Sequence, residues 1–305
     1  MRSKIFALLL VFVIAFTFFA CETIQQAASI GLQAVGVSPQ VADALARSGI
    51  DVLTVAANNQ FEEVTPEQEY FLGRAVAANI LASYRMKTDA PALTTYVNRI
   101  AAALVVNSIR PEIFSGYHVA VLDSDEINAF ATPGGHIFLT LGLVNSATSE
   151  DTLASVIAHE IAHVQLAHGY ATIKNSRLNQ AFAQAAFDVG SAGTGYDLAG
   201  MAETFGLSVD AMVNVLLNGY SREQEFQADA MAMSLMSLAG YEPSALIDML
   251  RVLETNQSGR RGGFNNTHPT PAQRIANAQT TVGNYNAEDT RSYREARYRA
   301  VRQTY

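Results

Sequence analysis

The chain has 305 residues, of which 49% are hydrophobic, which is enough apolar material for a buried core in one large domain or two small ones. Its single cysteine excludes an intramolecular disulfide and a cysteine-based metal site, so any metal must be bound by His and carboxylate side chains. The net charge of −8 argues against nucleic acid as a partner, because phosphate binding needs a basic surface.

The first residues have the layout of an export signal. A short basic start at residues 1–4 precedes an apolar run at 5–20, and the only cysteine, Cys21, follows directly. This pattern predicts a lipoprotein-type signal peptide over residues 1–20 and a lipid on Cys21. Simple secretion and an uncleaved anchor are the alternatives, because the residues before Cys21 match the lipoprotein pattern only loosely.

Composition divides the rest of the chain into three segments. Residues 21–62, rich in Ala, Gln and Val, are predicted to be a partly helical spacer, and residues 63–282 form the main domain. Within it, the glycine-rich stretch 189–200 is expected to be mobile. Residues 283–305 are predicted to be a basic C-terminal tail helix that is more simply explained as solvated than as lipid-bound.

The main domain is predicted to begin with two helices. Thr65 starts the first, followed by Pro at the first helical position, and the helix is expected to run to about Tyr84 with Phe71 and Leu81 among its buried residues. The second helix covers about 90–106.

A small sheet and two more helices follow in the prediction. Apolar and β-branched residues predict short strands at 117–122, 129–132 and 136–141. A helix then begins after Ser149, with acidic residues in its first turn, and another begins at Ser221, capped with Gln224. This order predicts an α+β fold that is mostly helical and contains a small β-sheet.

The helix after Ser149 carries the motif from His159 to His163. Residues four apart on a helix share a face, so His159 and His163 can both bind one zinc ion. Glu160 falls beside them, where it can accept a proton from a water molecule without binding the metal. These residues predict one zinc ion per chain and Glu160 as general base.

A third ligand is available on the helix after Ser221. Glu225 and Asp229 lie four residues apart on one face, so one can bind the metal while the other accepts a hydrogen bond from a ligand imidazole. Taken alone, such a pair is more often a solvated helix face.

These residues, together with three further motifs, resemble the zinc metallopeptidases of the HtpX and CAAX-prenyl-protease type, especially the exported, Oma-like bacterial members. The similarity covers about residues 65–280 and rests on motifs in the expected order. They are Asn128 to Gly135, His159 to His163, Glu225 to Asp229, and His268-Pro269 followed by Arg274-Ile275.

The resemblance implies a zincin-like metallopeptidase domain over 63–282 in which an edge strand of the sheet lines the active-site cleft. It implies that His159, His163 and Glu225 bind zinc, with Asp229 in support. It also implies that the strand containing Asn128, Ala129 and Phe130 pairs with an extended substrate, which β-augmentation of an exposed strand edge makes physically reasonable.

Two other histidines lie near the motif. The resemblance implies that His268 faces the zinc, where it either donates a hydrogen bond to the oxyanion or closes the site by approaching the metal. His168 follows His163 by five residues and would point away on a continuous helix, so we expect it at the helix end or on the surface.

The sequence therefore favours an exported zinc endopeptidase that acts on unfolded or misfolded envelope proteins. It would be tethered through Cys21 to the periplasmic side of a bacterial membrane. Two other functions remain open: a chaperone or assembly factor that uses the cleft mainly for binding, and a structural zinc protein with His268 as fourth ligand. The oligomeric state is not predicted.

Overall fold

The structure, a computed structural model, describes residues 65–169, 171, 213, 216, 219–256, 268, 270–284 and 290–305. All of these residues belong to one unit of the chain, Gln60–Tyr305. The predicted signal peptide, Cys21, the 21–62 spacer and the glycine-rich stretch at 189–200 lie outside the described residues.

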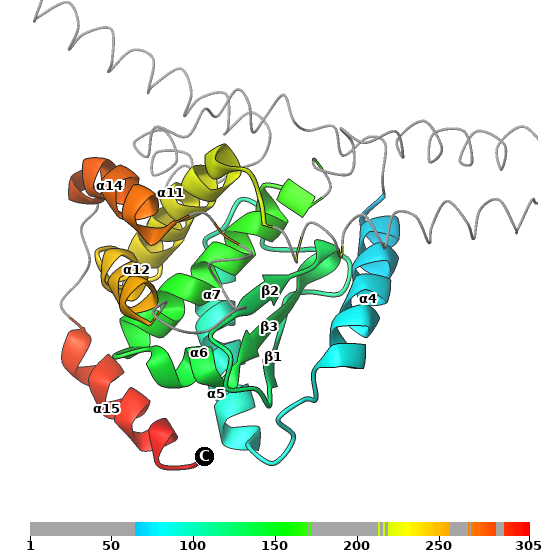
Figure 1. Ribbon diagram of the computed structural model, residues 1–305, viewed down its shortest axis with the longest axis horizontal. Helices are drawn as coiled ribbons and strands as arrows, with labels where there is room; N and C mark the ends of the chain where they lie inside the picture. Colours follow the sequence, from blue (N-terminus) through cyan, green and yellow to red (C-terminus); the bar gives the residue numbers. More distant parts are fainter. Residues whose placement is uncertain are drawn as a thin grey trace, which may run out of the picture. The chain divides into compact units, whose positions relative to one another are not determined.

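A three-stranded mixed sheet lies between helices (Figure 1). Its central strand β3 (His136–Thr140) is parallel to β1 (His118–Leu122) and antiparallel to β2 (Ala129–Ala131). Strand β2 is therefore an edge strand among the described residues. The turn η2 (Pro133–Gly135) joins β2 to β3, and Gly134 adopts a positive φ of 71° there, which side chains disfavour.

Helix α4 (Pro66–Ser83) packs against one face of this sheet and against the β2–β3 turn. A Cβ at Gly73 would lie 1.7 Å from the carbonyl oxygen of Pro133, so only glycine permits this approach. The core between α4 and the sheet consists of Leu72, Val76, Ala77, Ile80, Leu122, Phe130 and Phe138, joined by Leu216 and Tyr220. The expected burial of Phe71 and Leu81 is wrong: these side chains are 46% and 39% exposed, because α4 buries only one face.

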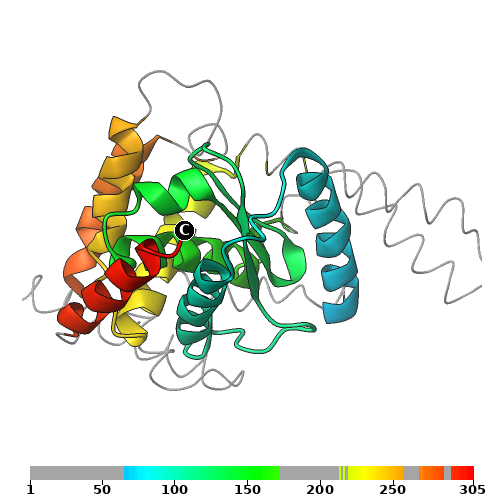
Figure 2. The same ribbon diagram turned by 90° about the horizontal axis from the view of Figure 1, so that it is seen from below.

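The other side of the sheet packs on α5 (Pro91–Val105) and α7 (Glu150–Gln165), as the view in Figure 2 shows. A short helix, α6 (Leu141–Ser146), follows β3 directly, so the strand predicted at 136–141 ends one residue earlier than expected. Every residue of α7 is buried, rather than one apolar face. This helix therefore lies at the centre of the unit.

The C-terminal part of the unit is helical. Its helices are α11 (Arg222–Leu238), α12 (Ala245–Thr255), α14 (Pro271–Thr281), the short η3 (Val282–Asn284) and α15 (Arg291–Arg302). Helices α11 and α12 pack on α7, and α14 packs on both of them. Neither α12 nor α14 is predicted from the sequence. Helix α14 lies past Leu253, where the chain becomes polar.

Helix α15 lies in the predicted tail segment 283–305 but is not a solvated tail. It packs on α5 and α7, and its Arg294 and Tyr298 are only 4% and 6% exposed. Arg294 forms an ion pair with Asp151, and Arg297 forms one with Glu150, both in the first turn of α7. Arg294 and Arg297 therefore bind acidic residues of the same unit.

The predicted α+β class with a small sheet is confirmed. Among the described helices, none combines the length and the apolar character that a membrane span requires.

Candidate metal centre

Helix α7 supplies the motif residues of the candidate site. Ser149 begins the helix with a capping box, in which its hydroxyl accepts a hydrogen bond from the backbone N–H of Thr152. Two turns later, His159 and His163 point their Nε2 atoms at each other, 3.0 Å apart. Both imidazoles are buried, at 1% and 2% exposure.

Helix α11 brings a carboxylate to these two nitrogens. It begins at Ser221 with a second capping box, and Glu225 follows one turn later. Glu225 Oε2 lies 3.5 Å from His159 Nε2, and Glu225 Oε1 lies 3.5 Å from His163 Nε2. The three residues predicted to be metal ligands therefore converge at one point.

Asp229 lies one turn further along α11, behind His159. Its Oδ1 atom is 3.0 Å from His159 Nδ1, on the opposite side of the ring from the converging nitrogens. This is the position predicted for it, since a carboxylate there can accept the ring N–H and fix the ring orientation.

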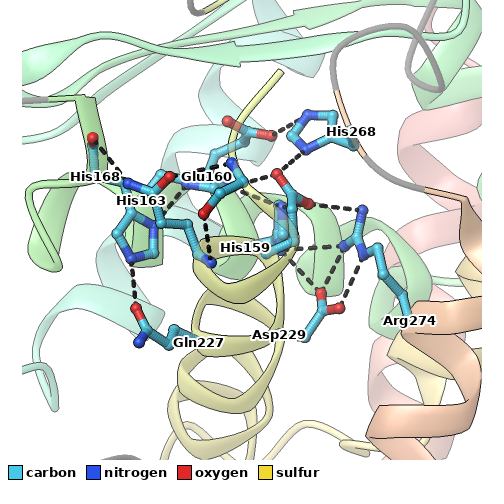
Figure 3. A network of polar contacts seen from close by, with 11 residues as sticks. His159, Glu160, His163, His168, Gln227, Asp229, His268 and Arg274 are labelled. Atoms are coloured by element: carbon cyan, nitrogen blue, oxygen red, sulfur yellow. Dashed lines mark hydrogen bonds and ion pairs between the residues drawn. The ribbon is translucent and has the colours of Figure 1, made fainter. Parts of the chain in front are cut away.

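His268 approaches the same point from outside both helices (Figure 3). Its Nδ1 atom lies 2.7 Å from Glu225 Oε1, and its Nε2 atom lies 4.0 Å from Glu160 Oε1. His159, His163, Glu225 and His268 each offer one ligand atom, and these atoms all lie within 4.8 Å of one another. His268 is thus placed to act either on the metal or beside Glu160, and both predicted roles stay open.

A buried arginine, for which the sequence predicts no role, also belongs to the cluster. Arg274, on α14, is 1% exposed and donates from Nε and Nη2 to the two oxygens of Asp229, at 2.8 and 2.6 Å. Its Nη1 atom lies 3.2 Å from Glu225 Oε2. The guanidinium therefore holds both carboxylates of α11 in place.

These contacts determine the charges of the cluster. Burial and Arg274 act to lower the pKa of His159, but Asp229 and Glu225 outweigh them and raise it to about 9. Burial acts to raise the pKa of Glu225, yet His268 and Arg274 hold it well below its usual range. Burial and the charge on His159 hold the pKa of His163 well below its usual value.

Glu160 is different from the other carboxylates, because burial raises its pKa above the usual range. Its Oε1 atom is buried and has no hydrogen-bond partner among the described residues. A raised pKa makes its carboxylate a better proton acceptor, which suits the predicted general base.

His168 lies just past the end of α7, as expected, but the predictions that it points away from His163 or lies on the surface are wrong. This residue is 3% exposed, and its Nδ1 atom lies 2.9 Å from Nδ1 of His163. Its Nε2 atom lies 3.2 Å from Oε1 of Gln227, on α11. The ring of Tyr220 also stacks on His163, with centroids 4.1 Å apart, and no sequence pattern indicated either contact.

The predicted substrate strand lies beside this cluster. Asn128, Ala129 and Phe130 belong to β2 or directly precede it, and their side chains are almost fully buried. Phe130 is part of the core under α4. These exposures are of whole residues, so the backbone of the strand is covered together with its side chains.

The cluster can hold a divalent cation. Imidazole nitrogens and a carboxylate converge within a buried space, and this donor set suits borderline metals. A metal would replace the close contact between the two Nε2 atoms and would balance the charge of Glu225. The geometry of the residues therefore fits a metal ion bound between α7 and α11.

Comparison with known proteins agrees with this geometry. Residues 91–282 match the family model of peptidase family M48. The chain is 29% identical to the beta-barrel assembly-enhancing protease of Escherichia coli O157:H7 over 249 residues, which cover 79% of this chain and 49% of that protein. This chain therefore spans about half the length of that relative.

Two further relatives are named as metallopeptidases. The mitochondrial metalloendopeptidase OMA1 of Schizosaccharomyces pombe is 27% identical over 230 residues, covering 74% of this chain and 64% of that protein. The metalloprotease LoiP of Escherichia coli strain K12 is 28% identical over 190 residues, covering 61% of this chain and 71% of that protein.

Proposed function

Because the chain belongs to peptidase family M48 and is a metallopeptidase, we propose that it is a zinc-dependent endopeptidase that cleaves unfolded or misfolded cell-envelope proteins. The observation that carries the proposal is the convergence of His159, His163 and Glu225 next to Glu160, all of them buried.

Zinc is the metal that this donor set fits best. Two His nitrogens and one Glu oxygen are a common ligand set of catalytic zinc, and tetrahedral zinc at about 2.0–2.1 Å from each ligand sets neighbouring ligand atoms about 3.3 Å apart. The observed separations of 3.0 Å between the Nε2 atoms and 3.5 Å from each of them to Glu225 bracket that value. When bound, zinc supplies a Lewis acid that polarises a carbonyl oxygen and makes water more acidic.

Glu160 performs the proton transfers in this proposal. It accepts a proton as the water oxygen attacks the peptide carbonyl, and it delivers that proton to the amine nitrogen as the C–N bond breaks. Its buried position and raised pKa favour acceptance of the proton, and its Oε1 atom accepts no hydrogen bond among the described residues, although His268 Nε2 lies 4.0 Å away.

The edge of β2 supports binding of extended substrates. Among the described strands β2 pairs only with β3, so the proposal has a peptide pair with its other edge. That edge is covered in this structure, because Ala129 and Ala131 are 1% and 2% exposed and the N–H of Ala129 donates to Oδ1 of Asn128, so binding there requires the covering chain to move. Because the side chains of Ala129 and Phe130 are buried, recognition would rest on backbone hydrogen bonds. Such binding favours unfolded chains and gives broad sequence specificity.

The proposed location is the periplasmic side of a bacterial membrane, with a lipid on Cys21 as the tether. The sequence pattern of residues 1–21 supports this. One relative is named for β-barrel assembly, which supports substrates in the cell envelope. Nucleic acid is not among the proposed partners.

His268 favours a second candidate function, that of a structural zinc protein in which the metal only joins the two helices. Its proximity to the other three ligands gives the cluster four donors, which is the number of a closed zinc site. The replacement His268→Ala separates the roles. Cleavage that rises in the variant indicates that His268 closes the site, whereas cleavage that falls indicates that it stabilises the oxyanion.

The proposal is tested by comparing the full chain with its Glu160→Gln variant on an unfolded reporter protein. We expect cleavage to fall by roughly 10²–10⁴-fold while bound zinc is unchanged, because the variant keeps all metal ligands. Glu223→Gln, which removes an exposed carboxylate from the first turn of α11, is the matched control and should cleave normally. Equal cleavage by wild type and Glu160→Gln would overturn the proposal.

A further inference from the structure

The chain leaves the helical path immediately after α7, and His168 comes to lie against His163. Helix α7 ends at Gln165, and Ala167 has a φ of 51°, the one positive φ at a non-glycine position among the described residues. Such a residue breaks the helical path. His168 therefore does not point away from His163, as a continuous helix would require.

His168 is held on both sides by groups of the metal centre. Its Nδ1 atom lies 2.9 Å from His163 Nδ1, and its Nε2 atom lies 3.2 Å from Gln227 Oε1. Gln224 also donates from Nε2 to the backbone oxygen of His168, at 3.3 Å. Both glutamines lie on α11, so the helix that carries Glu225 also fixes His168 (Figure 3).

The atoms that face one another determine where the protons lie. His163 turns Nε2 toward Glu225 and His159, so metal binding at Nε2 leaves the ring proton on Nδ1. Two ring nitrogens 2.9 Å apart need one donor and one acceptor, so His168 Nδ1 accepts that proton. A neutral His168 then carries its own proton on Nε2 and donates it to the amide oxygen of Gln227, which can only accept.

Burial agrees with this assignment, because His168 is 3% exposed and a buried imidazole with no carboxylate on its hydrogen bonds is favoured in its neutral form. The arrangement repeats, with a different acceptor, what Asp229 does for His159, where a carboxylate oxygen lies 3.0 Å from Nδ1. Each of the two imidazoles on α7 thus has a hydrogen-bond acceptor behind it, one charged and one neutral.

We propose that His168, oriented by Gln227, is a positioning residue that fixes the ring and tautomer of His163 for metal binding. The inference rests on the proposed zinc site but not on the peptidase reaction. A hydrogen-bond acceptor behind a ligand imidazole is worth roughly 10–100-fold in metal affinity. His168 and Gln227 therefore contribute to zinc affinity without touching the metal.

The test is the zinc dissociation constant of the full chain, measured by competition with a chromophoric chelator. His168→Leu removes the acceptor and should raise the constant by roughly 10–100-fold. His168→Gln retains an amide oxygen that can accept from His163, and it should restore most of the affinity. His136→Leu is the matched control, because His136 is a partly buried His outside the cluster, and its zinc affinity should equal that of wild type.

Variants of Gln227 give an independent test of the inference. Gln227→Leu removes the acceptor that orients His168 and should weaken zinc binding less than His168→Leu does, whereas Gln227→Glu keeps an acceptor and should restore it. If His168→Leu fails to fold, the two Gln227 variants and His168→Gln still test the inference. The visible spectrum of the cobalt(II)-substituted protein adds a readout of ligand geometry, which should change in Gln227→Leu and return in Gln227→Glu.

Two results would overturn the inference: zinc affinity of His168→Leu within twofold of wild type, or equal losses in His168→Leu and His168→Gln, which would indicate packing alone. A wild-type chain that binds zinc but does not cleave protein would contradict the proposed function and leave this inference intact. The two failures are therefore distinguishable.

Discussion

Both ends of α7 are surrounded by buried charge, but the two clusters are balanced differently. At the N-terminal end, each carboxylate of the first turn has its own guanidinium. Asp151 forms an ion pair with Arg294 at 3.0 Å. Glu150 forms an ion pair with Arg297, and Glu150 is itself fully buried.

At the other end, three buried carboxylates lie around the two imidazoles and share one guanidinium among the described residues. Arg274 contacts Asp229 and Glu225, while Glu160 keeps one oxygen without a hydrogen-bond partner. The carboxylates here outnumber the arginine, and in the metal-free protein a protonated His159, whose pKa is raised to about 9, supplies the second positive charge.

The N-terminal end of α7 therefore has a structural role, and its C-terminal end has a functional one. A one-to-one ion pair is complete in itself, so the N-terminal cluster fixes α15 on α7 and needs no ligand. A buried cluster with excess acceptors is costly unless a cation joins it. Four measurements would break or sharpen this contrast.

The largest effect on stability is expected at the N-terminal end. Arg294→Leu leaves Asp151 buried without its ion pair, which should lower the free energy of unfolding by about 3–5 kcal/mol. Zinc content should not change. Denaturant titration measures the loss, and Arg291→Leu, at an exposed position on the same helix, is the control with an expected change within about 0.5 kcal/mol. A stability loss accompanied by loss of zinc would break the separation of the two ends.

Zinc bound at the C-terminal end of α7 should stabilise the folded protein. At a hundredfold excess over its dissociation constant, zinc should add about 2.7 kcal/mol to the free energy of unfolding relative to chelated protein. Arg294→Leu should show the same increment, because the clusters share no residues. Denaturation curves with zinc and with chelator give both numbers. An absence of any difference would indicate that no metal joins the cluster.

A smaller effect is expected behind His159. Asp229→Asn replaces a charged acceptor by a neutral amide and should weaken zinc binding by roughly 10–100-fold, or about 1.4–2.7 kcal/mol. Asp248→Asn, at an exposed position on α12, is the charge-matched control. Unchanged affinity in Asp229→Asn would show that Asp229 serves only to bind Arg274.

The smallest effect concerns the start of α7. Ser149→Ala removes the hydroxyl that accepts from Thr152 N–H and should cost about 1 kcal/mol of stability with zinc affinity unchanged. Thermal unfolding and chelator competition test the two parts. A drop in zinc affinity would show that the N-terminal turn transmits strain to the metal ligands.

Local signals predicted most of the elements that carry the site. In the sequence, Ser149 followed by acidic residues marks the start of α7, and Ser221 with Gln224 marks the start of α11. A spacing of four residues on each helix then places the ligand residues on one face. The three strands were found within about two residues of their ends because each is short and apolar.

The remaining parts depend on contacts that sequence spacing does not encode. His168 was misassigned because the turn at Ala167 interrupts the helix from which its direction was extrapolated. Arg274 lies 45 residues after Asp229, and nothing local indicates that a polar segment supplies a buried guanidinium. The same applies to α15, whose arginines resemble a solvated face until their buried acidic partners are known.

The most direct test of the account measures cleavage of an unfolded reporter by the full chain before chelation, after chelation, and after zinc is returned in known amounts. We expect cleavage to be lost when the metal is removed and to be restored in full at one zinc per chain. Cleavage that persists in the chelated protein, with no zinc detectable, would contradict a peptidase centred on His159, His163 and Glu225.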